Sequence, residues 1–259
     1  MTADEDTGPA VEYSLDGMLA IIRLNDPRRR NALSKAIVSG VLAALDRARE
    51  DKARAIVITG TGRVFSAGAN IDDLQAGWLD GTDEETDPTR LFRALVDSPR
   101  VVIAAVQGPA VGGGFELTLC CDLVVAVDSA FFQLPELGLG VIPNTGVARL
   151  VQIIGLRRAL DVILTRRRVG AAEALGLGLV SEVATADQLM ARAMALGQAV
   201  AGTAPPGALS VAKQAVQHHA RIDWSHVLAS LQAVPRAEWQ EGLDAFREHR
   251  APDFDRFWT

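Results

Sequence analysis

The sequence predicts an α/β fold, with parallel strands in its first part and mainly helices in its last part. Two apolar runs, at residues 55–60 and 101–106, have the length and composition of buried strands. A strand, a helix and a further strand in succession are typical of a parallel βαβ unit. From Pro143 onward the periodicity is mainly helical, and no low-complexity linker interrupts it. We therefore expect a β/α core that carries the functional site over residues 1–190, and a helical C-terminal region over residues 191–259.

The first elements follow from periodicity and turn residues. Residues 11–24 indicate two short strands around the turn Asp16-Gly17. Ser34 is expected to be the N-cap of a helix, because apolar residues then recur at helical spacing. Those residues are Ile37, Val38, Val41, Leu42 and Leu45.

The remaining elements are expected further along the chain. Helices are predicted at 91–97, before Pro99, and from Gly112-Gly113-Gly114 through Cys121. Strands are predicted at 122–127, 131–136 and 180–183. Later helices are predicted at 147–154, 157–165, 171–175, 186–201, 209–220 and 224–248. Residues 71–90 indicate loop or short helix with an acidic stretch, expected to be solvated: Asp80, Asp83, Glu84, Glu85 and Asp87.

Charge and hydropathy exclude several classes of function. The formal net charge of −6 argues against non-specific nucleic-acid binding, which needs clustered Lys and Arg. The apolar run at 101–106 is far too short to cross a bilayer, and residues 1–10 lack the features of a secretory signal. We expect a cytoplasmic protein with no nucleic-acid or membrane partner.

The residues also argue against a metal, a nucleotide cofactor or a nucleophilic triad. The two cysteines, Cys120 and Cys121, are adjacent and lack metal-ligand spacing. Gly114 is followed by Phe115-Glu116 rather than the Lys-Ser/Thr of a P-loop, and Gly60-x-Gly62 lacks the third glycine of a dinucleotide fingerprint. All four histidines lie in the helical C-terminal part, at positions 218, 219, 226 and 249, where surface positions are expected.

Two turns of small residues each follow a buried strand. Gly112-Gly113-Gly114 opens a helix, whose free N–H groups carry partial positive charge. Ser66-Ala67-Gly68-Ala69-Asn70 follows the strand at 55–60. Two such turns on neighbouring parallel strands can point at one spot and form a two-donor oxyanion site. For the triple glycine alone, a tight packing turn is the alternative.

Two carboxylates accompany these turns. Glu116 falls in the first turn of the helix that the glycines open, where it is either functional or an acid favoured by the helix dipole. Glu136 is the only charge in the apolar stretch 131–142, which predicts a buried, perturbed carboxylate unless it lies in a surface turn. Together they could handle a proton and a water. Arg28, Arg29 and Arg30 are either anchors for a phosphate-bearing ligand or a solvated basic loop.

The chain resembles the crotonase family, the enoyl-CoA hydratase/isomerase superfamily, through short motifs that run in order over nearly its whole length. The matching segments are Asn31-Ala32-Leu33, Phe65-Ser66-Ala67-Gly68-Ala69, Gly112-Gly113-Gly114-Phe115-Glu116-Leu117, Cys121-Asp122, Leu134-Pro135-Glu136-Leu137-Gly138-Leu139-Gly140, Pro143-Asn144-Thr145-Gly146, residues 171–180 and residues 245–252.

This resemblance implies a crotonase-like spiral of ββα units with a helical C-terminal region that builds a homo-trimer or a dimer of trimers. It implies an oxyanion hole from the N–H groups of Ala69 and Gly113, and hydratase roles for Glu116 and Glu136. Coenzyme A would be part of an acyl-CoA thioester substrate, and no separate cofactor is implied. The matched substrate and CoA positions are Ala67, Asn70, Ile71, Phe246 and Arg250, to which the basic loop adds Arg28 and Arg30.

The implied reaction is hydration of a trans-2-enoyl-CoA to a 3-hydroxyacyl-CoA, as in β-oxidation. An enoyl-CoA isomerase and a carnitinyl-CoA-type dehydratase of the same family are alternatives, and the latter branch shares the Phe-Glu-Leu and Leu-Pro-Glu forms. A non-catalytic RNA-binding scaffold and a ClpP-type serine protease fit less well, because the net charge is acidic and no His lies among the β/α motifs. The sequence departs from the family at Asn70, often Asp, and at Asn144, commonly Gly.

Overall fold

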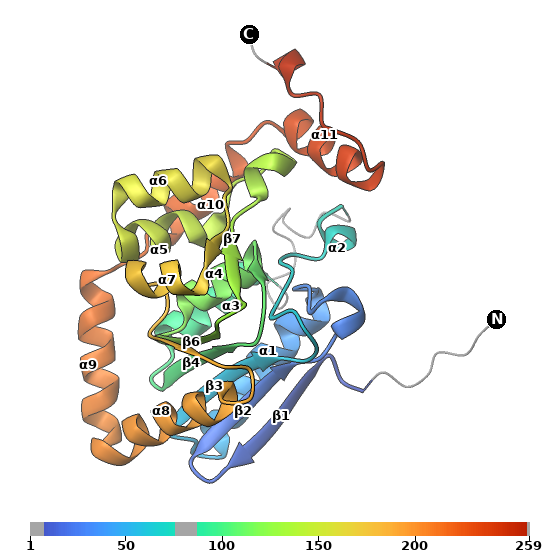
Figure 1. Ribbon diagram of the computed structural model, residues 1–259. Coiled ribbons are helices and arrows are strands. Elements are labelled where there is room, and N and C mark those ends of the chain that lie inside the picture. The colour runs from blue at the N-terminus through green and yellow to red at the C-terminus, as the bar shows by residue number, and fades with distance from the viewer. Residues whose placement is uncertain (1–7, 76–86, 258–259) are drawn as a thin grey trace, which may run out of the picture.

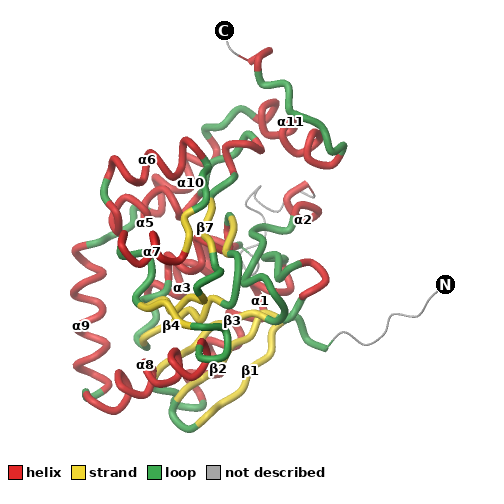
Figure 2. Tube along the Cα trace, viewed as in Figure 1, coloured by secondary structure: helices red, strands yellow, loops and turns green. Residues whose placement is uncertain are grey.

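The computed structural model describes residues 8–75 and 87–257, in which a twisted sheet is covered by helices on both faces (Figures 1 and 2). The main sheet has the strand order β1-β2-β3-β4-β6-β9. The edge strand β1 runs antiparallel to β2, and every later neighbour is parallel. These strands are β1 (Val11–Asp16), β2 (Leu19–Leu24), β3 (Ala55–Gly60), β4 (Val101–Val106), β6 (Leu123–Val127) and β9 (Glu182–Ala184).

A second, three-stranded sheet has the order β5-β7-β8. It contains β5 (Ala110–Val111), β7 (Phe131–Gln133) and β8 (Val169–Gly170). The two-residue strands are too short to leave a periodic signal, so the sequence did not predict them. The prediction of one strand through residue 136 was wrong at its end, because β7 stops at Gln133 and Glu136 opens the 3₁₀ helix η2 (Glu136–Leu139).

Helix α1 packs on β1 and β2 of the main sheet, α3 packs against α1 and α4, and capping residues mark where the helices begin. Ser34 caps α1 as predicted, since its hydroxyl accepts a hydrogen bond from the Ile37 amide at 3.3 Å. Asp87, from the acidic stretch, likewise caps α3 through the Thr89 amide. The rest of that stretch lies outside the described residues. These helices are α1 (Lys35–Glu50), α2 (Ile71–Gln75), α3 (Pro88–Asp97) and α4 (Gly113–Cys120).

The later helices complete the fold. Pro235 divides the single helix predicted at 224–248 into two, since proline ends helical hydrogen bonding at its position. The later helices are α5 (Asn144–Ile154), α6 (Leu156–Thr165), α7 (Ala171–Leu177), α8 (Leu189–Thr203), α9 (Pro206–His219), α10 (Trp224–Gln232) and α11 (Arg236–Arg247). The short 3₁₀ helices η1 (Pro27–Arg29) and η3 (Asp255–Phe257) lie near the two ends.

Alternation along β2 separates the two faces of the sheet. Ala20, Ile22 and Leu24 belong to the core cluster that includes the apolar side of α1, whereas Leu19 packs with Ala201 of α8. Successive side chains of a strand point to opposite faces, so α1 and α8 cover opposite sides of the sheet. The division of the chain at residue 190 into a core and an oligomerisation region stays a prediction, while α8 itself packs on the sheet.

The Asn31 side chain connects two loops that lie next to the turn 66–70. The residue is fully buried and adopts a left-handed φ of 54°. Its side-chain oxygen accepts from the Asp26 amide at 2.9 Å. Its side-chain nitrogen donates to the carbonyls of Thr61 and Val64 at 2.9 and 2.8 Å. One side chain therefore satisfies three backbone groups from two loops.

Replacing Asn31 with Ala should lower the free energy of unfolding by roughly 2–4 kcal/mol, because two part-buried carbonyls lose their donor and because Ala tolerates the left-handed conformation less well than Asn, whose polar side chain bonds locally. Urea denaturation would measure the change. Asn25→Ala is the matched control, since the Asn25 side chain makes only exposed hydrogen bonds. Equal stability of the two variants would refute the role given to Asn31.

Candidate active site

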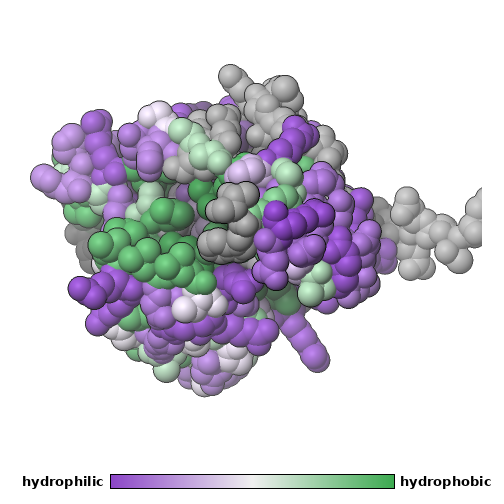
Figure 3. Space-filling model, turned by 90° about the horizontal axis from the view of Figure 1, so that it is seen from above, coloured by the Kyte–Doolittle hydropathy of each residue, from purple (hydrophilic) through white to green (hydrophobic). Residues whose placement is uncertain are grey.

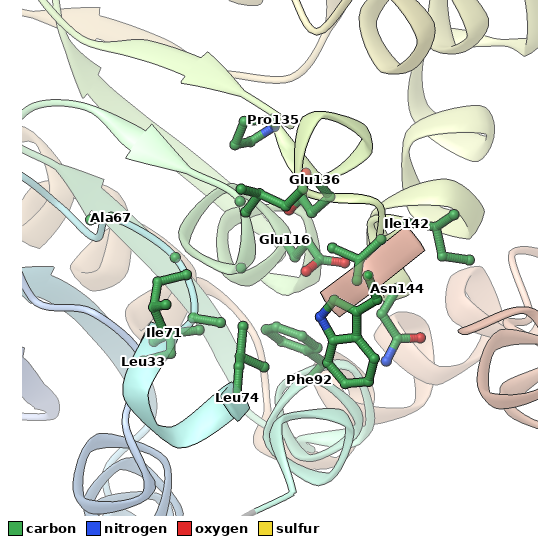
Figure 4. A pocket seen from close by; sticks show the side chains of 17 residues that line it. Leu33, Ala67, Ile71, Leu74, Phe92, Glu116, Pro135, Glu136, Ile142 and Asn144 are labelled. Carbon is green, nitrogen blue, oxygen red and sulfur yellow. The ribbon is translucent and has the colours of Figure 1, made fainter. Parts of the chain in front are cut away.

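A small apolar cavity lies where the turn 66–70, the start of α4, η2 and the start of α5 meet (Figure 4). Its volume is about 120 Å³. Apart from two carboxylates and one amide, its lining is made of glycines and apolar side chains. The lining includes Leu33, Ala67, Gly68, Ala69, Ile71, Leu74, Phe92, Gly112, Gly113, Glu116, Pro135, Glu136, Leu139, Val141, Ile142, Asn144 and Trp239.

Two backbone N–H groups face this cavity without an acceptor. Leu33 holds the first turn on both sides: its amide donates to the Gly68 carbonyl at 2.7 Å, and its carbonyl accepts from the Asn70 amide at 2.9 Å. That pattern leaves the Ala69 N–H unused. Gly113 is the first residue of α4, and the first N–H groups of a helix have no acceptor within the helix. Over residues 8–75 and 87–257, neither N–H has a hydrogen-bond acceptor.

Ala69 and Gly113 border the same space. A Cβ added at Gly113 would lie 3.6 Å from the Ala69 nitrogen and 3.9 Å from Oε2 of Glu116. Gly68 has a φ of +94°, and a Cβ there would lie 2.8 Å from the Val111 carbonyl oxygen. Glycine is thus needed both for the turn and for the open space, which could hold an oxyanion beside a carboxylate.

Glu116 is held by the first turn of α5. Its Oε1 accepts from the Gly146 amide at 2.7 Å, and the Thr145 amide also stabilises the anion. The side chain is buried. Burial raises its pKa to about 7, and the two amides limit that rise because they favour the charged form.

Glu136 lies beside Glu116 in the cavity (Figure 4). Its Oε2 is buried and has no hydrogen-bond partner among the described residues. Burial and the negative charge of Glu116 hold its pKa well above the usual range. Backbone amides favour the charged form of Glu116, whereas Oε2 of Glu136 has no such partner among the described residues, so the pair can offer a base and an acid.

The predicted substrate positions divide into two groups. Ala67 and Ile71 line the cavity. Asn70 does not: its Oδ1 caps α2 by accepting from the amides of Asp72 and Asp73 at 2.9 and 3.2 Å. Its relation to substrate stays a prediction.

The predicted coenzyme A positions lie outside the cavity. Arg28 and Arg30 are exposed, although the Arg30 carbonyl accepts from the Ala67 amide at 3.0 Å and so lies next to the first turn. Phe246 is 53% exposed. Arg250 is engaged by Glu241 and Glu248, each at 2.6 Å. Contact of these four residues with coenzyme A stays a prediction.

Several lining residues carried no signal in the sequence. Trp239 reaches the cavity from α11, because that helix packs closely against η2: a Cβ at Gly242 would overlap the backbone of Leu139. Phe92 and Leu74 come from helices on the other side. Asn144 was not predicted to be a site residue either, but the sequence had marked it as a departure from the family motif.

Two other features, a metal site and a membrane span, are absent from the described residues. Over the described ranges, no group of three or more His, Cys, Asp or Glu side chains could hold a metal ion. None of the helices described there has both the length and the apolar character to cross a bilayer.

Comparison with known proteins identifies the family. The family model for enoyl-CoA hydratase/isomerase matches residues 15–256. A Thermus thermophilus protein provisionally named an enoyl-CoA hydratase is 37% identical over 92% of this chain and 98% of its own length. The 2,3-dehydroadipyl-CoA hydratase of Escherichia coli is 35% identical over 90% and 94%. The crystal structure of carnitinyl-CoA hydratase from Mycobacterium avium superimposes with a TM-score of 0.86 at 31% identity, covering 96% of this chain and all of that one.

The fold and the match place the chain among α/β enzymes that act on acyl-CoA thioesters. It belongs to the enoyl-CoA hydratase/isomerase family, and its fold is the crotonase fold, as the sequence motifs predicted.

The buried pair should make stability depend on pH. Because the pKa of Glu136 is higher in the folded chain than in the unfolded chain, its contribution is fully present below the ordinary glutamate pKa and is lost as the pH rises through the folded value. Glu136→Gln removes the charge that burial disfavours. The melting temperature of this variant should exceed that of the wild type by several degrees at alkaline pH, since one pKa unit is about 1.4 kcal/mol and 1 kcal/mol is roughly 2–4 °C in a chain of this size.

Thermal melts from pH 5 to 9 would measure this difference. Glu50→Gln, at an exposed position of α1, is the control. A gap that does not widen with rising pH would contradict the assigned burial of Glu136.

Proposed function

We propose that the protein is a hydro-lyase that adds water across the double bond of a trans-2-enoyl-CoA to give a 3-hydroxyacyl-CoA. The observation that carries this proposal is the pair of buried carboxylates with unlike proton affinities, beside two free backbone N–H groups in one cavity. Hydration needs both a base for water and an acid for the α-carbon, and the pair supplies them near neutral pH.

In the proposed reaction, the thioester carbonyl accepts hydrogen bonds from the N–H groups of Ala69 and Gly113. Ionised Glu116 takes a proton from water as the water oxygen bonds to C3. The electron pair of the double bond moves into the thioester, and the enolate oxygen is stabilised by the two N–H groups. Protonated Glu136 then gives its proton to C2, which completes the addition of H and OH.

The start of α4 strengthens the oxyanion site. Gly113 is the first residue of this helix, so its N–H lies at the positive end of the helix dipole. A negative charge that develops on the thioester oxygen in the transition state is stabilised there more than the neutral carbonyl of the ground state.

Two other reactions of the family provide alternatives for the same site. Moving a double bond needs only one carboxylate, and the presence of both Glu116 and Glu136 favours hydration over isomerisation. A carnitinyl-CoA-type dehydratase would catalyse related chemistry on a cationic acyl group. Because the chain is similar to the Mycobacterium avium structure, a cationic enoyl-CoA is included among the substrates of the test.

The proposal is tested with crotonyl-CoA, a longer 2-enoyl-CoA, a 3-enoyl-CoA and a trimethylammonium-bearing enoyl-CoA, followed by loss of conjugated-thioester absorbance and by mass spectrometry. We expect hydration of a 2-enoyl-CoA. Glu116→Gln and Glu136→Gln should each lower kcat by roughly a hundredfold or more, the usual contribution of a general acid or base. No hydration at any chain length, or near-normal rates in either variant, would overturn the corresponding part of the proposal.

Gly113→Ala tests the oxyanion space. The new methyl group would lie 3.1 Å from Leu33 Cδ1, 3.6 Å from the Ala69 nitrogen and 3.9 Å from Oε2 of Glu116, and so should occupy the oxyanion space. We expect kcat to fall by about a hundredfold, comparable to the loss of one oxyanion donor. Gly176→Ala is the control, because a Cβ at that helical position meets nothing within 4 Å. If steady-state kinetics gave the same rate for both variants, the N–H groups would not serve the reaction.

We also propose that the chain assembles as a homo-trimer, or as a dimer of trimers, through exposed apolar side chains. Leu156, Leu160 and Leu164 follow one another at four-residue spacing along α6 and are 62%, 44% and 62% exposed. Val147 and Val151 are also four residues apart on α5 and are 39% and 36% exposed. Figure 3, seen from above, shows apolar residues gathered toward the side on which α5 and α6 lie in Figure 1. A contiguous apolar stripe of this kind favours burial against another subunit.

Sedimentation velocity would test this assembly. Leu160→Glu should convert the trimer to monomers, because it places a charge in the apolar contact. Leu15→Glu, at an equally exposed apolar position on β1, should leave the assembly unchanged. A monomeric wild type would contradict the proposal. Contacts of Arg28, Arg30, Phe246 and Arg250 with coenzyme A, a cytoplasmic location and a place in β-oxidation stay predictions.

A further inference from the structure

Arg149 of α5 is a buried cation whose described hydrogen-bond acceptors are uncharged. The residue is 6% exposed. Its Nε donates to the Leu119 carbonyl at 3.0 Å. One of its terminal nitrogens donates to the side-chain oxygens of Gln152 and Gln217 at 3.2 and 3.1 Å. A cation is costly to bury unless it is hydrogen-bonded, so these contacts determine where the guanidinium lies.

The Leu119 carbonyl belongs to the last turn of α4. The final carbonyls of a helix have no partner within the helix and carry partial negative charge. In α4, the Thr118 carbonyl accepts from the Cys121 amide, and the Leu119 carbonyl accepts from Arg149. All eight residues of α4 are buried, so water is a poor substitute for these donors. Arg149 therefore completes the hydrogen bonding at one end of the helix whose other end forms the oxyanion site.

This contact repeats, one turn further along, the contact that holds the catalytic carboxylate. Oε1 of Glu116 on α4 accepts from the Gly146 amide on α5 at 2.7 Å. Leu119 lies three residues after Glu116, and Arg149 lies three residues after Gly146. Three residues make nearly one helical turn, a rise of about 4.5 Å. The two helices are thus joined at successive turns in the same register, and a shift that breaks one contact displaces the other.

The buried thiol of Cys120 confirms that both charges act on one small region. Burial raises the pKa of this thiol most, Arg149 lowers it and Glu116 raises it. The other charged group that acts on this region is Glu136 of η2. Burial also raises the pKa of the neighbouring Cys121 thiol, so both thiols stay neutral where the glutamates titrate.

We propose that Arg149 is a positioning residue of the hydration site, which holds the last turn of α4 against α5 so that the Gly146 amide stays on the Glu116 carboxylate. This inference rests on the proposed hydration for its kinetic readout. Without Arg149, the helices lose one of the two contacts that fix their register, and the amide that favours ionised Glu116 is displaced. A base that ionises less readily activates water only at higher pH.

The pH dependence of kcat/KM measures this role. Arg149→Met fills the space with an apolar side chain that donates no hydrogen bond. The acid limb of its profile should move up by about one pH unit, the effect of losing one hydrogen bond to a charged group. Arg149→Gln removes the charge but keeps a donor near the position of Nε, so its acid limb should stay close to that of the wild type. An unmoved limb in Arg149→Met, or an equal shift in both variants, would overturn the proposal.

Val57→Ala is the control for a general loss of stability. Val57 is fully buried in β3, so the substitution leaves a cavity in the core but touches neither α4 nor α5 directly. Its acid limb should coincide with that of the wild type. If Arg149→Met does not fold, Arg149→Leu, which also lacks a donor, takes its place in each measurement.

A second background separates positioning from a purely structural role. Near pH 6, Arg149→Met should lower kcat about tenfold in the wild type, which corresponds to one pKa unit. In Glu116→Gln, where no base is left to position, the same substitution should change kcat by no more than about twofold. An equal loss in both backgrounds would contradict the role given to Arg149.

Thermal melts keep this inference separate from the proposed reaction. Burial raises the folded-state pKa of Glu116 to about 7, so its contribution to stability is present below the ordinary glutamate pKa and is lost as the pH rises through about 7. Arg149→Met should raise that folded-state pKa further. Its melting temperature should therefore fall progressively further below that of the wild type between pH 5 and 9, and this widening should be absent in the Glu116→Gln background.

The two failures are distinguishable. If no 2-enoyl-CoA is hydrated, the proposed function fails, and the melts still decide the role of Arg149. A difference in melting temperature between Arg149→Met and the wild type that does not change with pH refutes the inference, even if crotonyl-CoA is hydrated.

Discussion

The close approach of two backbones, the turn 66–70 and the start of α4, is the constraint on which the rest of the site depends. The Val111 amide donates to the Ser66 carbonyl at 3.0 Å, and a Cβ at Gly114 would lie 2.5 Å from that same oxygen. Any side chain at Gly68 or Gly114 would push the segments apart. Asn31 supports the turn from behind through three hydrogen bonds. Two unused N–H groups can share one space only because these contacts hold both segments in register.

The electrostatics of the site opposes the stability of the fold. Two carboxylates share a buried, apolar cavity, and burial of the charged forms is unfavourable. The first turn of α5 resolves this conflict unequally, because its amides stabilise charge on Glu116 and leave Oε2 of Glu136 unpaired. An asymmetry in hydrogen bonding between two chemically identical side chains thus produces one acid and one base.

The C-terminal helices contribute to the cavity as well as packing on the core. Helix α11 packs on η2 and brings Trp239 to the cavity, so that residues far apart in the sequence close one site. Arg250, which the family motif associates with coenzyme A, is held here in ion pairs with Glu241 and Glu248. In this chain those pairs anchor the segment that follows α11 to the helix itself, whereas the packing of α11 on η2 brings it to the cavity.

The sequence by itself determined the order of the main elements, the N-cap of α1, the family and the pairing of the two glycine-containing turns with Glu116 and Glu136. These features are local: they depend on periodicity, on turn chemistry or on short motifs whose neighbours lie within a few residues. The end of β7, the break at Pro235 and the strands β5 and β8 were missed, because short elements give weak periodic signals and depend on pairing with distant segments. Only the tertiary structure decided that Asn70 caps α2, that the two glutamates differ in proton affinity, and that Asn144 and Trp239 face the same cavity. Each of these depends on burial and on contacts between segments far apart in the chain, which no local pattern records.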